Sequence, residues 1–568
     1  MLFFMKKIAT VLLLSLLCMG YLPMYAQFKI VAEGPEFEEP EEGFAKILQL
    51  KNGNTFYIHI TPKDGINIRV YDINKKEKVS TISPSYDNLK GDDVVESVFE
   101  INNKVMVFLN KSEDRVIKLY RLIIDGTTGK LVQQKVIAER QKFDKEILRY
   151  HNPFPNQREL QQFDFFSIRK DQYSDNYAIA AFNDGEPDAT KRLEIIHFDS
   201  DNNEINRKFC FLKNSTNCRF IDMAVIGTEK VCAFVVFTDK KELKNHMMAL
   251  IEKGVPEIIF TDLPISNDIF SLFKEAEYNL YWRKFFFGTA KYNPVSHKII
   301  YLETGIMSLI KHLSWDSRKV DCFSTLHIID PEKLKTQSIP NFKPAEKLNV
   351  AYKEILDIKQ NYNGIPQKLI VKDDGSFTVV FEETVFLYDN SGNGTDLGSI
   401  AVSAYNQDGA LKSEYLIPKS HFIINHRYSP LYLSERELGA QKLFKGNQFK
   451  SFDIIDAPKN EYILFNDSKR NNDVENARKT TRFGTGNRTK LIKVIGVTAE
   501  CDAFMYKLTG TDVLPKREYL FAEMDKERAL ALLTISDYNK KNNTYATLML
   551  DKKNIISKMV SIVWQEPD

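Results

Sequence analysis

A short β unit recurs along this chain, and it limits the folds that the chain can adopt. In the stretch AFNDGEPDATKRLEIIHFDSDNNEI (181–205), an apolar run stops at Asn-Asp, a polar loop follows, and a second apolar run stops at Asp199. The same scheme appears at 105–125, 231–252 and 529–551, with a tighter version at 55–72. One meander of short strands cannot bury both of its faces, so such units stack on copies of themselves.

Within each unit, the residue pattern is that of strands joined by tight turns. Ile66, Ile68 and Val70 alternate with other residues at the period of two that half-buried strands show. An Asp at a strand end accepts hydrogen bonds from the next backbone amides and so begins a turn. A following Gly, as in IIDGTTGK and NQDGAL, provides the positive φ that tight hairpins require.

Acidic residues mark these turns at eight positions: 72, 125, 199, 252, 330, 408, 502 and 551. Their average spacing of roughly 68 residues exceeds the roughly 40–50 of short propeller repeats. The excess falls in four insertions, at 151–162, 266–284, 422–443 and 470–490. We therefore predict an all-β fold, a single β-propeller of seven or eight blades built from antiparallel four-stranded meanders with long loop insertions. The alternative is an irregular multidomain β protein, such as two sandwiches.

The N-terminus has the pattern of an export signal. Lys6 and Lys7 precede an apolar run from Ile8 to Leu17, which is short for a membrane span. We expect residues 1–26 to be a signal peptide, with cleavage after Ala26; an uncleaved anchor and a lipoprotein modified at Cys18 are the alternatives. Residues 27–43, with six Glu in EGPEFEEPEEG, are predicted to form an extended acidic lead-in. Residues 44–568 are then the propeller domain.

Composition excludes one broad class of partner. Loss of the leader removes two lysines and leaves 76 basic residues against 76 acidic ones. A neutral chain has no general electrostatic attraction for nucleic acid, so no nucleic-acid partner is predicted. No later stretch is apolar enough to cross a bilayer, so no transmembrane span is expected after signal removal.

Five cysteines remain after the leader, and none form the C-x-x-C pair typical of zinc sites. Cys210 and Cys218 are close enough in sequence for a local disulfide, and two buried small hydrophobes are the equal alternative. The odd number leaves at least one thiol unpaired in an oxidising compartment.

Three stretches resemble an uncharacterised family of exported propeller-like proteins from Bacteroidetes-type bacteria. They are LQLKNGNTFYIHIT (48–61), GSIAVSAYNQDGALKSEYLIPKS (398–420) and NEYILFND (460–467), and the MYAQ leader junction is also similar. These motifs are strands and turns. The resemblance therefore implies a fold and an exported location, and it implies no activity, ligand or catalytic residue.

One loop has part of a calcium-binding pattern. In DNSGNGTD, the residues Asp389, Ser391, Asn393 and Gly394 occupy positions 1, 3, 5 and 6 of a calcium loop, where alternate oxygens converge and Gly makes the bend. Position 12 should be an acid and is Ile400. Ca²⁺ is the one cofactor that the sequence suggests, a plain turn is the alternative, and no other metal site is predicted.

Two insertions carry candidate ligand-binding residues. In NARKTTRFGTGNRTK, the residues Arg478, Arg482 and Arg488 surround Phe483, a combination that could grip a phosphate, a nucleic acid strand or an acidic glycan. In AEYNLYWRKFFF, Trp282 and Tyr281 could form a platform on which a sugar stacks. The plainer alternatives are a solvated loop for the first segment and core packing for the second.

The predicted propeller and its candidate residues are compatible with two functions, and the fold alone does not distinguish between them. The first is a non-catalytic binding or assembly protein of the cell envelope, which presents propeller loops to a protein or glycan partner. The second is a hydrolase or lyase that acts on polysaccharide or peptide, with acids in the propeller channel. No local catalytic motif is present in the sequence, which favours the first. A periplasmic location is expected over the cell surface or secretion, because we identify no C-terminal sorting domain.

Overall fold

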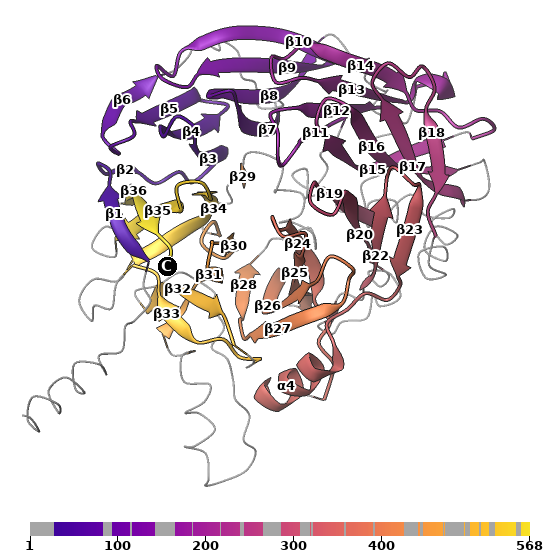
Figure 1. Cartoon of the computed structure of the whole chain (residues 1–568). Helices are drawn as coiled ribbons and strands as arrows, with labels where there is room; N and C mark the ends of the chain where they lie inside the picture. The colour runs from indigo at the N-terminus through magenta and orange to yellow at the C-terminus, as the bar shows by residue number, and fades with distance from the viewer. Residues whose placement is uncertain are drawn as a thin grey trace, which may run out of the picture.

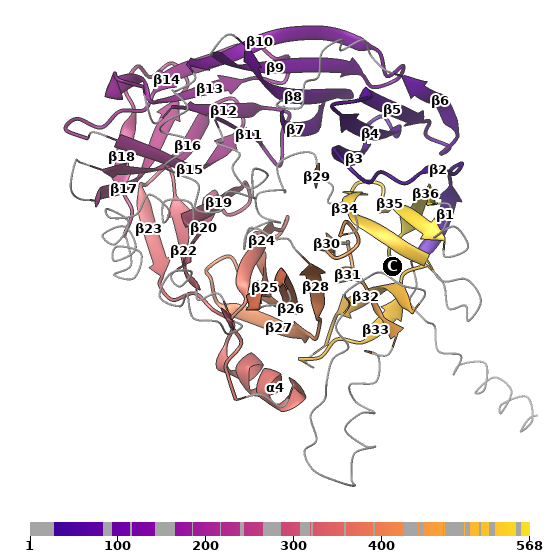
Figure 2. The same ribbon diagram turned by 180° about the vertical axis from the view of Figure 1, so that it is seen from behind.

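The fold is an eight-bladed β-propeller, seen as a ring in the computed structural model (Figure 1) and again from behind (Figure 2). The structure describes residues 28–82, 94–113, 116–141, 165–183, 186–215, 217–238, 243–264, 286–306, 318–319, 322–356, 359–389, 392–424, 441–442, 447–469, 471, 494, 500–510, 513–521, 529–551 and 558–568. The predicted all-β class and the single propeller are confirmed, and the blade number is eight.

Each blade is an antiparallel meander whose first strand lies innermost, and we number the blades along the chain. Blade 1 consists of β3 (Phe44–Gln49), β4 (Thr55–Thr61), β5 (Gly65–Tyr71) and β6 (Glu77–Ile82). Blade 2 consists of β7 (Val94–Ile101), β8 (Lys104–Glu113), β9 (Val116–Asp125) and β10 (Leu131–Gln141). Blade 3 consists of β11 (Phe166–Lys170), β12 (Tyr177–Phe182), β13 (Leu193–Phe198) and β14 (Glu204–Phe209), and blade 4 of β15 (Asn217–Ile226), β16 (Lys230–Thr238), β17 (Leu243–Glu252) and β18 (Ile259–Asp262).

Blade 5 consists of β19 (Phe286–Asn293), β20 (Lys298–Ile306), β22 (Cys322–Asp330) and β23 (Lys335–Ile339). Blade 6 consists of β24 (Ile365–Val371), β25 (Phe377–Asp389), β26 (Gly392–Tyr405) and β27 (Leu411–Ile417). Blade 7 consists of β30 (Phe452–Asp456), β31 (Glu461–Ser468), β32 (Cys501–Leu508) and β33 (Arg517–Tyr519), and blade 8 of β34 (Ala529–Asn539), β35 (Thr544–Asp551), β36 (Met559–Glu566) and β1 (Lys29–Glu33). Four short strands add to three of the sheets: β2 (Phe37–Glu38) pairs with β36 of blade 8, and β29 (Gln441–Lys442) pairs with β3 of blade 1. In blade 6, β21 (Arg318–Lys319) pairs with β25 and β28 (His421–Ile424) pairs with β26.

The N-terminal segment closes the ring. Residues 27–43 were expected to be an extended lead-in, and within them β1 forms the outermost strand of blade 8, pairing Lys29 with Glu566 and Glu33 with Val563. Phe28 is buried at the same place, with its ring against those of Tyr462 and Tyr545. Blade 8 therefore takes three strands from the C-terminal end of the chain and one from the N-terminal end.

Apolar side chains between neighbouring sheets form the core. Blades 1 and 2 share one hydrophobic cluster, and a comparable cluster fills each following interface around the ring. The last interface joins blade 8 to blade 1, where Trp564 packs edge-on against Tyr71 and donates its Nε1–H to Thr55 Oγ1 at 3.0 Å. Each sheet thus covers the apolar face of the next, as stacked repeats require.

Most of the predicted turn acids lie where the repeat places them. Asp72, Asp125, Asp199 and Asp330 each follow or end the third strand of a blade, and each Oδ1 accepts hydrogen bonds from two backbone amides of its turn. Glu252 and Asp408 mark the equivalent turns of blades 4 and 6.

Two of the eight marks are wrong. Asp502 lies inside β32, opposite Asp467, and Asp551 ends the second strand of blade 8. The reason for the second error is the ring closure, since the third strand of blade 8 ends near the C-terminus and its outer neighbour comes from residues 29–33.

Helix is scarce, as expected. The described residues contain one α-helix, α4 (Glu346–Leu356), and a 3-10 turn, η2 (Ala189–Lys191). The helix buries Leu348, Tyr352 and Ile355 in the core cluster shared by blades 5 and 6, and the Tyr352 hydroxyl donates to the carboxylate of Glu383. This helix was not predicted from the sequence.

Candidate functional site

The two faces of the ring differ in the length of their connections. In blades 1 to 7, the turns that join the first strand to the second, and the third to the fourth, have two to eight residues, and in blade 8 the turn between β34 and β35 has four. Every longer connection joins the second strand to the third, or one blade to the next, and leaves from the opposite face. We call these the short-turn face and the long-connection face. The strand ends that flank all four predicted insertions lie on the long-connection face.

The short-turn face is braced across the ring. The turn between β11 and β12 of blade 3 reaches blade 6, where Gln172 Nε2 donates to the Val371 carbonyl at 3.0 Å. Lys540 of blade 8 bridges Asp373 of blade 6 and Asp456 of blade 7, at 2.8 and 2.9 Å. Turns from non-adjacent blades are therefore bonded to each other at this face, and the short turns leave few residues that could form a variable binding loop.

Charged side chains from the innermost strands meet in the centre of the ring. Lys368 of β24 forms an ion pair with Asp453 of β30 at 2.9 Å, and Asp453 also accepts from the Tyr545 hydroxyl. Asp537 of β34 accepts from the backbone N–H of Gln49 at 2.7 Å, and it interacts electrostatically with Lys46. Burial raises the pKa of Asp537 and lowers that of Lys46. The acids of this channel cluster are thus matched by lysines.

A β-bulge places Asp537 in this cluster. The register of β34 against β35 shifts between Leu532 and Asp537, so the four residues between them face a single residue of β35. Bulges of this kind redirect side chains near sites. No periodicity in the sequence signals the shift, because a bulge interrupts the alternation that sequence reading relies on.

The two longest connections are rooted side by side on blades 6 and 7, over a buried polar layer that we call the insertion base. Lys419 follows β27 and forms an ion pair with Glu382 of β25, and both side chains are fully buried. His421 Nδ1 lies 3.0 Å from the Lys450 carbonyl, and Lys450 Nζ donates to the Phe422 carbonyl and to Asn447 Oδ1. These bonds hold the connection at the insertion base at both of its ends, around His421 and around Lys450.

The second long connection is anchored in the same way. Asn471 Nδ2 donates to Asp467 Oδ1 at 2.8 Å, and Arg517 lies 3.4 Å from the other oxygen of that carboxylate. Burial is the largest influence on Asp467 and raises its pKa. At the far end, Val494 donates to the Ser420 carbonyl and accepts from the N–H of Phe422. The described residues on both sides of 472–493 therefore sit on the insertion base.

The ligand-binding residues predicted from the sequence all lie outside the described residues. They are Arg478, Arg482, Phe483, Arg488, Tyr281 and Trp282. Their predicted roles stay predictions, although the insertion that holds the arginines leaves from the insertion base.

The proposed calcium loop lies at a hairpin of blade 6. Asp389 pairs with Gly392 and Tyr388 pairs with Asn393, so Asp389 and Asn393 belong to β25 and β26, and Ser391 lies outside the described residues. Calcium binding here stays a prediction. Across the described ranges, no group of three or more His, Cys, Asp or Glu side chains is arranged to hold a metal ion.

The buried charges were not predicted from the sequence. One signal was available: Glu382 and Glu383 interrupt the mostly apolar run TVVFEETVFLY, and Glu303 lies in KIIYLETGI. An acid in the middle of a buried strand needs a partner. The sequence could not name that partner, because Lys419 comes from a connection 37 residues away and His246 comes from another blade.

Glu303 lies between two imidazoles at the interface of blades 4 and 5. Its two oxygens are each 3.2 Å from a ring nitrogen, one of His246 and one of His327, and all three side chains are no more than 1% exposed. Burial lowers the pKa of His246 to about 4. The Tyr301 hydroxyl and the Ser338 hydroxyl contact the outer nitrogens of the two rings.

This cluster predicts acid sensitivity. Between pH 6.5 and about 4 the unfolded chain protonates His246 more readily than the folded chain does, so stability should be complete above pH 6.5 and fall toward pH 4. His246→Gln should remove ~3 kcal/mol of that pH dependence. Urea unfolding at several pH values measures it. The exposed-turn variant His297→Asn is the control, and an unchanged slope in His246→Gln would contradict the prediction.

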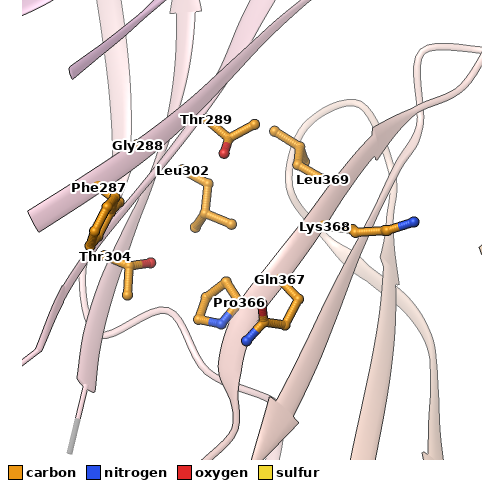
Figure 3. Close-up of a pocket in the computed structure, with 9 residues that line it drawn as sticks. All are labelled: Phe287, Gly288, Thr289, Leu302, Thr304, Pro366, Gln367, Lys368 and Leu369. Carbon is orange, nitrogen blue, oxygen red and sulfur yellow. The ribbon is translucent and has the colours of Figure 1, made fainter. Parts of the chain in front are cut away.

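A small cleft lies between blades 5 and 6, and Figure 3 shows its lining. Leu302 of β20 faces Pro366 and Gln367 of β24 across it, whereas the Lys368 side chain points away. Its empty volume of about 270 Å³ includes open solvent, and ligand pockets of drug size run from ~300 to 1,000 Å³. The cleft is smaller than a typical ligand pocket, so we take the long-connection face as the candidate site.

In the part of the chain that the structure describes, no helix combines the length and apolar character that a membrane crossing needs. No family model matches the sequence, and a search of curated proteins found no match.

Solved structures with similar folds match at low identity. Sqt1 from Chaetomium thermophilum is 8% identical with a TM-score of 0.39, covering 94% of this chain and 98% of that one. The polysaccharide lyase Uly1 is 10% identical with a TM-score of 0.36, covering 95% and 100%. A post-proline cleaving enzyme from Rickettsia typhi is 8% identical with a TM-score of 0.31, covering 75% and 57%. Values this low carry no argument about what the present chain does.

Proposed function

We propose that this protein is a non-catalytic binding or assembly protein of the cell envelope. It uses the long-connection face to hold a protein or glycan partner. One observation carries the proposal: every connection longer than eight residues leaves from one face of a closed ring. The two longest share the buried insertion base. Variable loops on a rigid scaffold are where binding functions concentrate.

The insertion base supports binding because it holds the loop ends rigidly. Lys419, His421 and Asp467 are each 1% exposed or less, and the hydrogen bonds around them fix the backbone at Ser420, Phe422 and Val494. Rigid attachment lowers the entropy that a loop loses on binding. Export to the periplasm, as the leader pattern suggests, is part of the proposal.

The alternative function is a hydrolase or lyase whose acids lie in the channel cluster. Asp453 and Asp537 are the residues that favour it, since both are carboxylates on innermost strands and the pKa of Asp537 is raised. The ion pair of Asp453 with Lys368 and the interaction of Asp537 with Lys46 support a structural role instead. Binding therefore remains the first proposal.

A capture experiment tests the binding proposal. The purified protein is immobilised and exposed to envelope extract and to a glycan array. The triple variant Arg478→Ser, Arg482→Ser, Arg488→Ser should bind the captured partner at least tenfold more weakly, a loss of ~1.4 kcal/mol or more. The matched control replaces Lys253, Lys459 and Lys541 by serine, three exposed lysines on the short-turn face, and should bind like the parent chain.

The outcomes are distinct. A saturable protein or glycan partner that the control retains and the arginine variant loses supports the proposal. Equal loss in both triple variants, or no retained partner, overturns it. Release of cleaved glycan or peptide, abolished by Asp453→Asn or Asp537→Asn, would establish the alternative function.

A further inference from the structure

Two cysteines flank the connection between blades 3 and 4. Cys210 follows β14, and its backbone N–H donates to the Leu193 carbonyl at 2.8 Å, extending the ladder of blade 3 by one residue. Cys218 lies at the start of β15, paired with Phe237 of blade 4. Both lie at the long-connection end of their strands. Neither forms a disulfide in this structure.

Both side chains face the same interface from opposite sheets. Cys210 is fully buried in the core cluster that blade 3 shares with blade 4, a cluster that includes Leu193 and Phe220. Cys218 is partly buried against that cluster. It lies two residues before Phe220 with no register shift between them, so the two side chains project from the same face of β15.

The remaining described cysteines are distributed differently. Cys232, Cys322 and Cys501 lie on strands of blades 4, 5 and 7, and Cys232 and Cys501 belong to two other core clusters. Burial raises the pKa of Cys210, and the neighbouring Cys218 raises it further, which is consistent with two sulfurs close to each other. Of the five described thiols, these two are the pair that shares an interface.

We propose that Cys210 and Cys218 form an intramolecular disulfide when the chain meets a thiol–disulfide oxidant. The Cys218 thiolate attacks one sulfur of the oxidant's disulfide and expels the other as a thiolate. The Cys210 thiolate then attacks the Cys218 sulfur and expels the second oxidant thiolate. The two cysteines lose two protons and two electrons, and the oxidant disulfide is reduced to two thiols.

The order of these steps follows from burial. Cys218 is partly exposed and can meet an oxidant in the folded protein, whereas Cys210 is fully buried. A buried thiol with a raised pKa is a slow nucleophile. The disulfide should therefore form faster during folding than in the native ring. Export through an oxidising compartment, which the leader pattern predicts, would provide that opportunity.

Refolding of the full chain in a glutathione buffer tests the proposal. The unfolded protein is refolded with oxidised and reduced glutathione, or with reduced glutathione alone. Remaining thiols are then alkylated under denaturing conditions, and peptides are mapped by mass spectrometry. The oxidised sample should lose two hydrogens in mass and show a peptide linked through Cys210 and Cys218, while Cys232, Cys322 and Cys501 stay alkylated.

Variants make the outcome decisive. Cys218→Ser, at the partly exposed position, should abolish the mass loss and leave Cys210 alkylated, and Cys210→Ala should do the same for Cys218. Cys232→Ser should retain the linked peptide. The proposal is overturned if both thiols remain alkylated after oxidative refolding, if Cys218 carries only glutathione, or if the linkage joins a different pair.

Discussion

Replacing Lys419 by methionine is expected to lower the free energy of unfolding by about 3–5 kcal/mol. The ammonium of Lys419 is the ion-pair partner of Glu382, and both side chains are fully buried. Phe452 and Phe465 lie beside the ammonium, and Glu382 is fully buried, so water cannot compensate its carboxylate for the lost cation. Urea unfolding measures the loss as a lower midpoint at an unchanged slope.

A second substitution distinguishes pairing from packing. Adding Glu382→Leu to Lys419→Met replaces the ion pair by two apolar side chains, and such replacements are often neutral or stabilising. We expect the double variant to recover most of the lost stability. If the double variant is as unstable as Lys419→Met, the cost comes from lost packing at position 419 and not from the buried charge.

Removing residues 1–38 should destabilise the ring even more. The shortened chain loses β1, which pairs with β36, and it loses Phe28, which packs against Tyr462 and Tyr545. Truncating one buried Phe costs about 3–5 kcal/mol on its own. Thermal unfolding should therefore begin at a clearly lower temperature, with the edge of β36 left without its outer strand.

Adding the missing segment as a separate peptide tests whether the shortened chain loses stability because the ring is no longer closed by β1. A synthetic peptide of residues 28–38 should raise the unfolding temperature of the shortened chain in a concentration-dependent way, because it binds only the folded ring. A scrambled peptide of the same composition is the control, and Phe28→Ala in the full chain should show part of the effect. A shortened chain that unfolds at the parent temperature would contradict the closure described here.

Local chemistry made the blades predictable. The alternation at Ile66, Ile68 and Val70 and the acids at strand ends reflect interactions between residues close in sequence, and the period of two and the turn amides act within a few positions. The repeat therefore predicted the class, the meanders and six of the eight turn marks. The insertions were visible as well, because they interrupt the same pattern.

The candidate site was less predictable, since its buried groups depend on distant partners. Glu382 in its apolar run indicated a buried acid, and nothing near it in sequence indicated Lys419. His246, Glu303 and His327 come from three strands of two blades. Hydrogen bonds and ion pairs of this kind leave no periodic signal, because each partner satisfies its own local pattern equally well without the other.

The sequence by itself determined that the chain forms short antiparallel strands in repeated meanders with four long insertions. The tertiary structure alone decided that the ring has eight blades, that residues 29–33 complete the last one, and that all long connections share a face. The physical reason is the distance along the chain over which the deciding interactions act. Strand formation and turns are set by neighbouring residues, whereas closure pairs Glu33 with Val563, and that pairing exists only once every blade between them has stacked.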